Sequence, residues 1–205
     1  MKEPIIQSLF PTPVYKTDIN RLFTNDELNF VQSQKNFVNK NDGNVSSSDN
    51  YILNRKELKN IKKFLDDCCK DYLEKIICPK ENIKLYITQS WLNYTEENQF
   101  HHMHEHPNSI ISGVLYFNSD EKNDKIKFTR SNRYQQIVPL IKTFNIWNSH
   151  TWWFSVKSGE LILFPSSTTH QVDVKQGTNT RISLAFNTFY KGKLGKDSEL
   201  TELIL

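Results

Sequence analysis

The sequence lacks the features that mark membrane, secreted and strongly charged proteins. It has no run of about 18 apolar residues, the length that a membrane span needs, and its start has no long apolar segment typical of a signal peptide. Its formal net charge is only +3, from 26 basic and 23 acidic residues spread over 205 positions. This charge gives no support for a nucleic-acid partner. We therefore expect a cytoplasmic protein without a membrane partner.

Cysteine is scarce as well. The chain has three, of which Cys68 and Cys69 are neighbours and Cys78 has no partner at disulfide or zinc spacing. This usage is typical of a reducing compartment, and we expect all three side chains to be packing residues. The apolar fraction of 37% and the aromatic fraction of 12% fit one compact globular domain over residues 1–205.

The first part of the chain has a helical period. The capping-box spacing of Thr24 and Glu27 predicts a helix over 24–39. The polar stretch 41–50 predicts a loop. A second helix is predicted over 54–77, because its apolar residues form one stripe: Leu58, Ile61, Phe64, Leu65, Cys68, Tyr72, Leu73 and Ile76.

After Pro79 the period changes to two, which indicates strands. We predict strands at 83–94, 110–117, 125–130, 151–157, 160–164, 170–174 and 180–190. Seven strands without intervening helices favour an antiparallel sandwich or barrel. The fold class is therefore α+β, with the N-terminal helices packed on one face of the β unit.

The last of these strands has two unlike faces. Its bulky apolar residues, Ile182, Leu184 and Phe186, alternate with polar or small ones, so one face should pack against the core. On the other face Arg181 and Ser183 are two residues apart, and a guanidinium and a hydroxyl so placed could hold a carboxylate together. An edge strand with a solvated polar face is the alternative.

Four of the six histidines lie in the segment 101–106. In an extended chain His102, His104 and His106 point to one side, so an adjacent pair among them can offer two imidazoles to one metal ion. His170, which follows a strand that begins with glycine and ends with proline, is the candidate third ligand. Alone, each element also fits a histidine-rich surface loop or a structural histidine. The combination favours a metal site.

The sequence resembles the 2-oxoglutarate and iron(II)-dependent oxygenase superfamily, in particular a group of small members frequent in bacteria and their phages. The resemblance spans roughly residues 85 to 190 and rests on four segments: Trp91 to Asn93, His104 to Tyr116, Gly159 to Pro165 with His170, and Arg181 to Asn187. It implies a double-stranded β-helix, or jelly-roll, core over 81–190 in a single oxygenase domain, with 1–80 as a helical support region.

The resemblance also implies the ligands. Iron(II) falls on His104, His106 and His170, and His106 stands where most relatives have a carboxylate, so the metal site becomes one of three histidines. His102 and His104 are also two residues apart and point to the same side of an extended chain, so this pair stays open as the alternative source of two metal ligands. The resemblance implies that Arg181 and Ser183 bind the far carboxylate of the cosubstrate 2-oxoglutarate. It also implies that Asn93 and Tyr116 belong to the cosubstrate site.

The implied activity is that of a dioxygenase that uses Fe(II), 2-oxoglutarate and O2, with ascorbate as a supporting reductant, and releases succinate and CO2 while hydroxylating a substrate. The sequence does not tell a small-molecule substrate from a peptidyl one. A homo-oligomer is compatible with it, and for a phage-encoded chain the location would be the host cytoplasm.

Two rival functions and one hypothesis about specificity remain. A three-histidine site also resembles cupin dioxygenases and isomerases that do not use 2-oxoglutarate, and a jelly-roll interaction protein would need no catalysis. Residues 118–150 are rich in aromatics and arginine and could form a lid or substrate rim that includes Arg133 and Trp147. A plain hairpin packed by its own aromatics is the alternative for this stretch.

Overall fold

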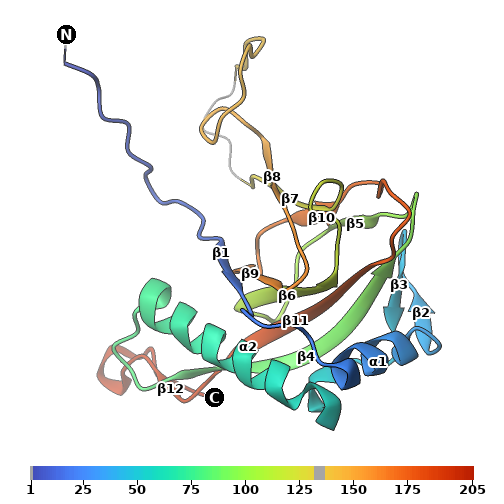
Figure 1. The fold of residues 1–205 in the computed structure, drawn as a ribbon. Coiled ribbons are helices and arrows are strands. Elements are labelled where there is room, and N and C mark those ends of the chain that lie inside the picture. Colours follow the sequence, from blue (N-terminus) through green and yellow to red (C-terminus); the bar gives the residue numbers. More distant parts are fainter. Residues whose placement is uncertain (1, 132–136) are drawn as a thin grey trace.

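The computed structural model describes residues 2–131 and 137–205. Over these residues the chain forms two main antiparallel sheets, with helices across one face of the larger one (Figure 1). The predicted α+β class is therefore confirmed. Within the described ranges, no helix is both long and apolar enough to cross a bilayer.

The larger sheet has seven strands among the described residues. Their order across the sheet is β1 (Tyr15–Asp18), β9 (Glu160–Pro165), β6 (Ile111–Asn118), β11 (Arg181–Lys191), β4 (Lys84–Thr95), β3 (Val45–Ser47) and β2 (Val38–Lys40). The long strands β4, β6 and β11 are neighbours at its centre, so residues from distant parts of the sequence share one face.

The smaller sheet has four strands over the same described ranges. They are β5 (His101–His104), β10 (His170–Val172), β7 (Lys125–Thr129) and β8 (Thr151–Ser155), and a separate pair near the C-terminus joins β12 (Lys193–Leu194) to β13 (Leu203–Ile204). All seven strands predicted after residue 80 are present, with ends that differ by a few residues.

The first helix, α1 (Asn25–Gln34), begins at the predicted capping box. The Thr24 hydroxyl accepts from the Glu27 amide at 3.2 Å, and the Glu27 carboxylate accepts from the Thr24 amide at 2.8 Å. The helix ends before residue 39, because the chain there enters β2, which pairs with β3 as a hairpin. The prediction of a helix to 39 was therefore wrong, and the predicted loop at 41–50 contains β3.

The second helix, α2 (Lys59–Tyr72), follows two short 3-10 turns and continues into a π-helical segment, Leu73–Ile77. Most of its predicted stripe packs on the large sheet, where Ile61 and Leu65 share a core with Leu92, but Ile76 at its end is exposed. Cys68 and Cys69 are buried as expected, but Cys78 is exposed, so the prediction that it packs was wrong.

The large sheet separates two hydrophobic cores. One lies against the helices and includes Ile182, Leu184 and Phe186 of β11. The other lies toward the small sheet and includes Tyr116 and Phe128. The two faces of β11 therefore differ as the sequence predicted, and its polar face is directed at the small sheet.

Candidate metal and cosubstrate site

The pairing of β5 with β10 brings the predicted histidines together. His104 lies directly opposite His170 in this ladder, with ring centroids 4.3 Å apart. Just after β5, the His106 amide donates to the Ser166 carbonyl at 3.0 Å. This bond holds His106 beside β10, where its Nε2 atom is 3.3 Å from Nε2 of His170. One ligand atom from each of the three histidines therefore lies within 4.8 Å of the others.

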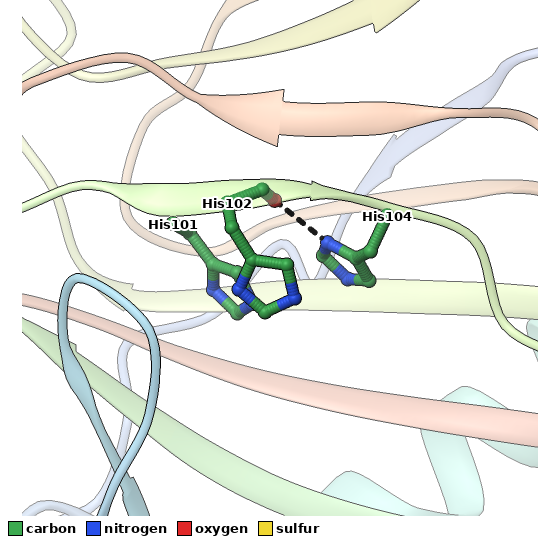
Figure 2. A group of neighbouring side chains, drawn as sticks. All are labelled: His101, His102 and His104. Atoms are coloured by element: carbon green, nitrogen blue, oxygen red, sulfur yellow. Dashed lines mark hydrogen bonds between the residues drawn. The ribbon is translucent and has the colours of Figure 1, made fainter.

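Backbone carbonyls determine which ring nitrogen each histidine offers. His104 Nδ1 lies 2.8 Å from the His102 carbonyl (Figure 2), and His170 Nδ1 lies 3.0 Å from the Thr168 carbonyl. A carbonyl only accepts, so Nδ1 carries the proton in both rings and Nε2 keeps its lone pair. Metal-binding histidines in proteins are held by the same kind of bond.

The surroundings of the three imidazoles keep them in the neutral form. Burial, followed by the effect of neighbouring His104, lowers the pKa of His106 to about 4. Burial lowers the pKa of His170 to about 3 and also lowers that of His104. All three rings are therefore neutral near pH 7, which is the form that binds a metal ion.

The strict alternation assumed for this segment fails at its first residues. His170 is paired with His104, and Val172 is paired with His101. Between these two pairs the chain advances three residues along β5 but only two along β10. This β-bulge turns His101 toward the same side as His104, and their rings stack at 4.7 Å. Figure 2 shows His101, His102 and His104 on one side of the strand.

His101 was therefore missed as a residue of the site, and the structure places it in the pocket wall. The amide nitrogen of Asn41 lies 3.3 Å from its Nε2 atom, and that of Asn44 lies 3.4 Å from Nδ1. Both asparagines belong to the turn between β2 and β3. No sequence signal predicts these contacts, because they depend on the bulge and on a hairpin that the sequence pattern did not reveal.

The predicted cosubstrate residues lie in the same pocket as the histidines, between the two sheets. Ser183 of β11 is in register with Asn93 on β4 and with Tyr116 on β6. Arg181 begins β11 on the same face. The pocket is lined by all seven predicted residues, which are His104, His106, His170, Arg181, Ser183, Asn93 and Tyr116.

Arg181 is the unusual side chain of this pocket. It is only 3% exposed, and over the described residues its Nε and Nη1 atoms have no hydrogen-bond partner. The Oδ1 atom of Asn93, also buried, has no partner within the same ranges. Buried N–H groups of a charged side chain that lack acceptors are costly, so the Arg181 side of the pocket is suited to an anionic ligand.

The stretch predicted as a lid or rim divides into two parts. It contains β7, a strand of the small sheet, and the described residues 137–150, which extend away from both sheets (Figure 1). Trp147 is 40% exposed, and its carbonyl accepts from the Arg130 guanidinium at 3.2 Å. Arg133 lies outside the described residues.

Comparison with known proteins agrees with this geometry. A family model described as "Putative 2OG-Fe(II) oxygenase" matches residues 89–187. No curated protein matches the sequence.

Solved structures share the fold at low sequence identity. HygX from Streptomyces hygroscopicus, with nickel, 2-oxoglutarate and hygromycin B bound, is 11% identical, with a TM-score of 0.57 over 86% of this chain and 82% of that chain. A Pseudomonas putida prolyl-4-hydroxylase is 10% identical, with a TM-score of 0.57 over 86% and 92%. A Burkholderia pseudomallei oxidoreductase of the 2OG-Fe(II) oxygenase family is 13% identical, with a TM-score of 0.55 over 79% and 76%.

The TM-scores show a common double-stranded β-helix fold, and at these low identities they show nothing finer. The range that the family model matches includes all three histidines, Arg181 and Ser183. Over residues 89–187 this chain is therefore similar to the family described as "Putative 2OG-Fe(II) oxygenase", and it shares its fold with the oxygenases above.

Proposed function

We propose that this protein is an Fe(II)- and 2-oxoglutarate-dependent dioxygenase that hydroxylates a substrate and releases succinate and CO2. His104, His106 and His170 would hold the metal, and Arg181 with Ser183 would bind the far carboxylate of the cosubstrate. The histidines fit this role because their ligand atoms lie within 4.8 Å of one another. When bound, iron(II) supplies the centre at which O2 is reduced while 2-oxoglutarate and the substrate are oxidised.

The observation that carries the proposal is the buried guanidinium of Arg181. Its Nε and Nη1 atoms lack partners among the described residues, although the side chain shares a pocket with the three imidazoles. A carboxylate bound there would accept the two unused N–H groups in a bidentate pair. The requirement for an anion at one end and a metal at the other suits a small dicarboxylate that chelates through its opposite end.

The remaining residues of the pocket would orient the cosubstrate and keep water out. The Ser183 hydroxyl and the Asn93 side chain face each other across β11 and β4, so both can contact the same carboxylate. Tyr116 is 1% exposed and lines the pocket where the pocket meets the core between the two sheets. The Trp91 ring lies 5.8 Å from that of His106 and shields the metal ligands on the side of β4. Exclusion of water strengthens each of these polar contacts.

A second candidate function follows from the ligand set itself. Three neutral histidines in place of two histidines and a carboxylate are also compatible with cupin-type dioxygenases or isomerases that need no 2-oxoglutarate. The uncompensated +2 charge of the metal favours an anionic chelator, and Arg181 provides a place for that chelator's second carboxylate. The oxygenase is therefore the function that the geometry supports better.

Two measurements test the proposal, one on the wild-type protein and one on Arg181→Ala. We expect 2-oxoglutarate to change the visible spectrum of the anaerobic Fe(II) protein. We expect Arg181→Ala to weaken 2-oxoglutarate binding by about a hundredfold, because it removes the partner of a buried carboxylate, without loss of Fe(II) binding. Arg55→Ala is the matched control, because it removes a guanidinium paired with Asp49 at the surface.

Two results would contradict the proposal. One is an Fe(II) spectrum that 2-oxoglutarate does not change, together with turnover that Arg181→Ala leaves unaltered, and this result would support the cupin function. The other is a failure of the protein with Fe(II), ascorbate and 2-oxoglutarate to release succinate above a His170→Ala control, even with candidate substrates. The substrate class, the cytoplasmic location and the oligomeric state stay predictions.

A further inference from the structure

We propose that His101, His102 and His104 form a second position for a divalent metal ion, and that this position excludes the one formed with His106 and His170 because both need His104. One ligand atom from each of these three histidines lies within 4.8 Å of the others. The three side chains lie together on one side of β5 (Figure 2). The inference concerns metal binding alone and does not depend on the use of 2-oxoglutarate.

The second position exists because of the bulge in β5. With regular alternation, His101 and His102 would point to opposite sides of the strand. The extra residue between the pairs His104–His170 and His101–Val172 instead brings both rings beside His104, at centroid distances of 4.7 Å and 4.9 Å. Three imidazoles from four consecutive residues thus gather around one point.

His104 can serve only one ion at a time. Its Nδ1 atom donates to the His102 carbonyl at 2.8 Å, so Nε2 is the single ring nitrogen with a lone pair to offer. An ion between His101 and His102 that also binds His104 therefore removes this ligand from His106 and His170. The same reasoning applies in the opposite direction.

The other two ligands of the second position are accessible in different ways. His102 is half-buried, and its Nδ1 atom lies 3.5 Å from the Asp42 carbonyl, a long contact. His101 is contacted by the amides of Asn41 and Asn44 at 3.3 and 3.4 Å, which is longer than a usual hydrogen bond. A metal–nitrogen bond can replace one of these weak contacts. Three neutral imidazoles would suit Co²⁺, Ni²⁺, Cu²⁺ or Zn²⁺.

Co²⁺ alone, without cosubstrate, is the probe for the test. Its affinity is measured by equilibrium dialysis, and its coordination is followed by visible absorption. For His106→Ala/His170→Ala we expect a Kd within about tenfold of the wild-type value, because the second position is intact. For His104→Ala, which removes the shared ligand, we expect binding to weaken by about a hundredfold or more, since even outer contacts to metal ligands account for 10–100-fold.

Further variants make the pattern specific. Adding His102→Ala to His106→Ala/His170→Ala should reduce Co²⁺ binding to the level of His104→Ala, whereas adding His150→Ala, a histidine outside the cluster, should not. Thermal unfolding without metal checks that each variant is folded. The proposal is overturned if His106→Ala/His170→Ala binds Co²⁺ as weakly as His104→Ala, or if adding His102→Ala changes nothing. Neither result would affect a 2-oxoglutarate-dependent spectrum or succinate release by the wild-type protein.

Discussion

At the scale of single residues, the site depends on which polar atoms are left free to bind. The carbonyls of His102 and Thr168 occupy Nδ1 of His104 and His170, and this fixes Nε2 as the atom offered to a metal. In contrast, the Nε and Nη1 atoms of Arg181 are buried without partners in the described part of the chain. The free Nε2 atoms of these histidines and the unpaired N–H groups of Arg181 therefore line one pocket.

Gly113 is a residue whose lack of a side chain the packing requires. It faces Phe186 on β11 and Leu163 on β9, and a Cβ atom here would lie 2.2 Å from the Phe186 ring and 2.7 Å from a Leu163 methyl. Both neighbours are fully buried, so neither ring nor methyl can move aside freely. We expect Gly113→Ala to lower the free energy of unfolding by about 1–3 kcal/mol, as overpacking does, in a denaturant titration.

A double variant separates overpacking from other effects of this substitution. Phe186→Leu removes the ring that the new Cβ would meet, so Gly113→Ala should cost less in the Phe186→Leu background than in the wild type. Equal costs in the two backgrounds would mean that Phe186 is not the cause.

At the scale of secondary-structure elements, local signals decided which predictions succeeded. The seven strands after residue 80 have clear alternation, and the α1 capping box has both of its bonds. The hairpin of β2 and β3 was missed because all three residues of β2 are exposed and the turn after it is polar. Neither strand has the alternation of apolar and polar residues that indicates a strand in a sequence. The extended conformation of β3 depends on its pairing with β4, which is distant in the sequence.

The same contrast applies to the site. The union of His104 with His170 could be predicted, because spacing and resemblance both favour it. The position of His101 could not, because it depends on a bulge that arises from the pairing of β5 with β10. A β-bulge moves the side chains on one side of it to the opposite face of the sheet. The alternation of residues in a sequence does not show where a bulge occurs.

The α1 capping box gives a prediction at the scale of the element. Thr24→Ala removes the acceptor of the Glu27 amide, and we expect a loss of about 1 kcal/mol in the free energy of unfolding. Thr24→Ser keeps the hydroxyl and should retain most of the stability. If the alanine and serine variants unfold at the same denaturant concentration, the hydroxyl does not stabilise the helix.

At the scale of the whole molecule, the two faces of the large sheet differ: one packs against the helices, and the other lines the pocket. The helices cover one face of the large sheet, where a core of α2 and β4 residues forms. The opposite face carries the pocket, which the small sheet closes with the histidines of β5 and β10. The described residues 137–150 extend away from this pair of sheets (Figure 1), so they contribute little to either core.

This division predicts a selective effect of Trp147→Ala. Trp147 is not among the residues that line the pocket, so Fe(II) and 2-oxoglutarate affinities should stay at their wild-type values. If the segment forms the substrate rim, the variant should release more succinate per substrate molecule hydroxylated. Equal losses of metal binding, cosubstrate binding and substrate turnover would instead show a structural role for this tryptophan.

A crystal structure of the anaerobic Fe(II) complex with 2-oxoglutarate tests the central claim most directly. We predict metal–nitrogen distances of about 2.0–2.2 Å to Nε2 of His104, His106 and His170, close to those of imidazole ligands in other metal sites. We also predict the far carboxylate within hydrogen-bond distance of the Arg181 guanidinium. A metal bound without His106 and His170, or a cosubstrate whose carboxylate does not contact Arg181, would contradict the claim.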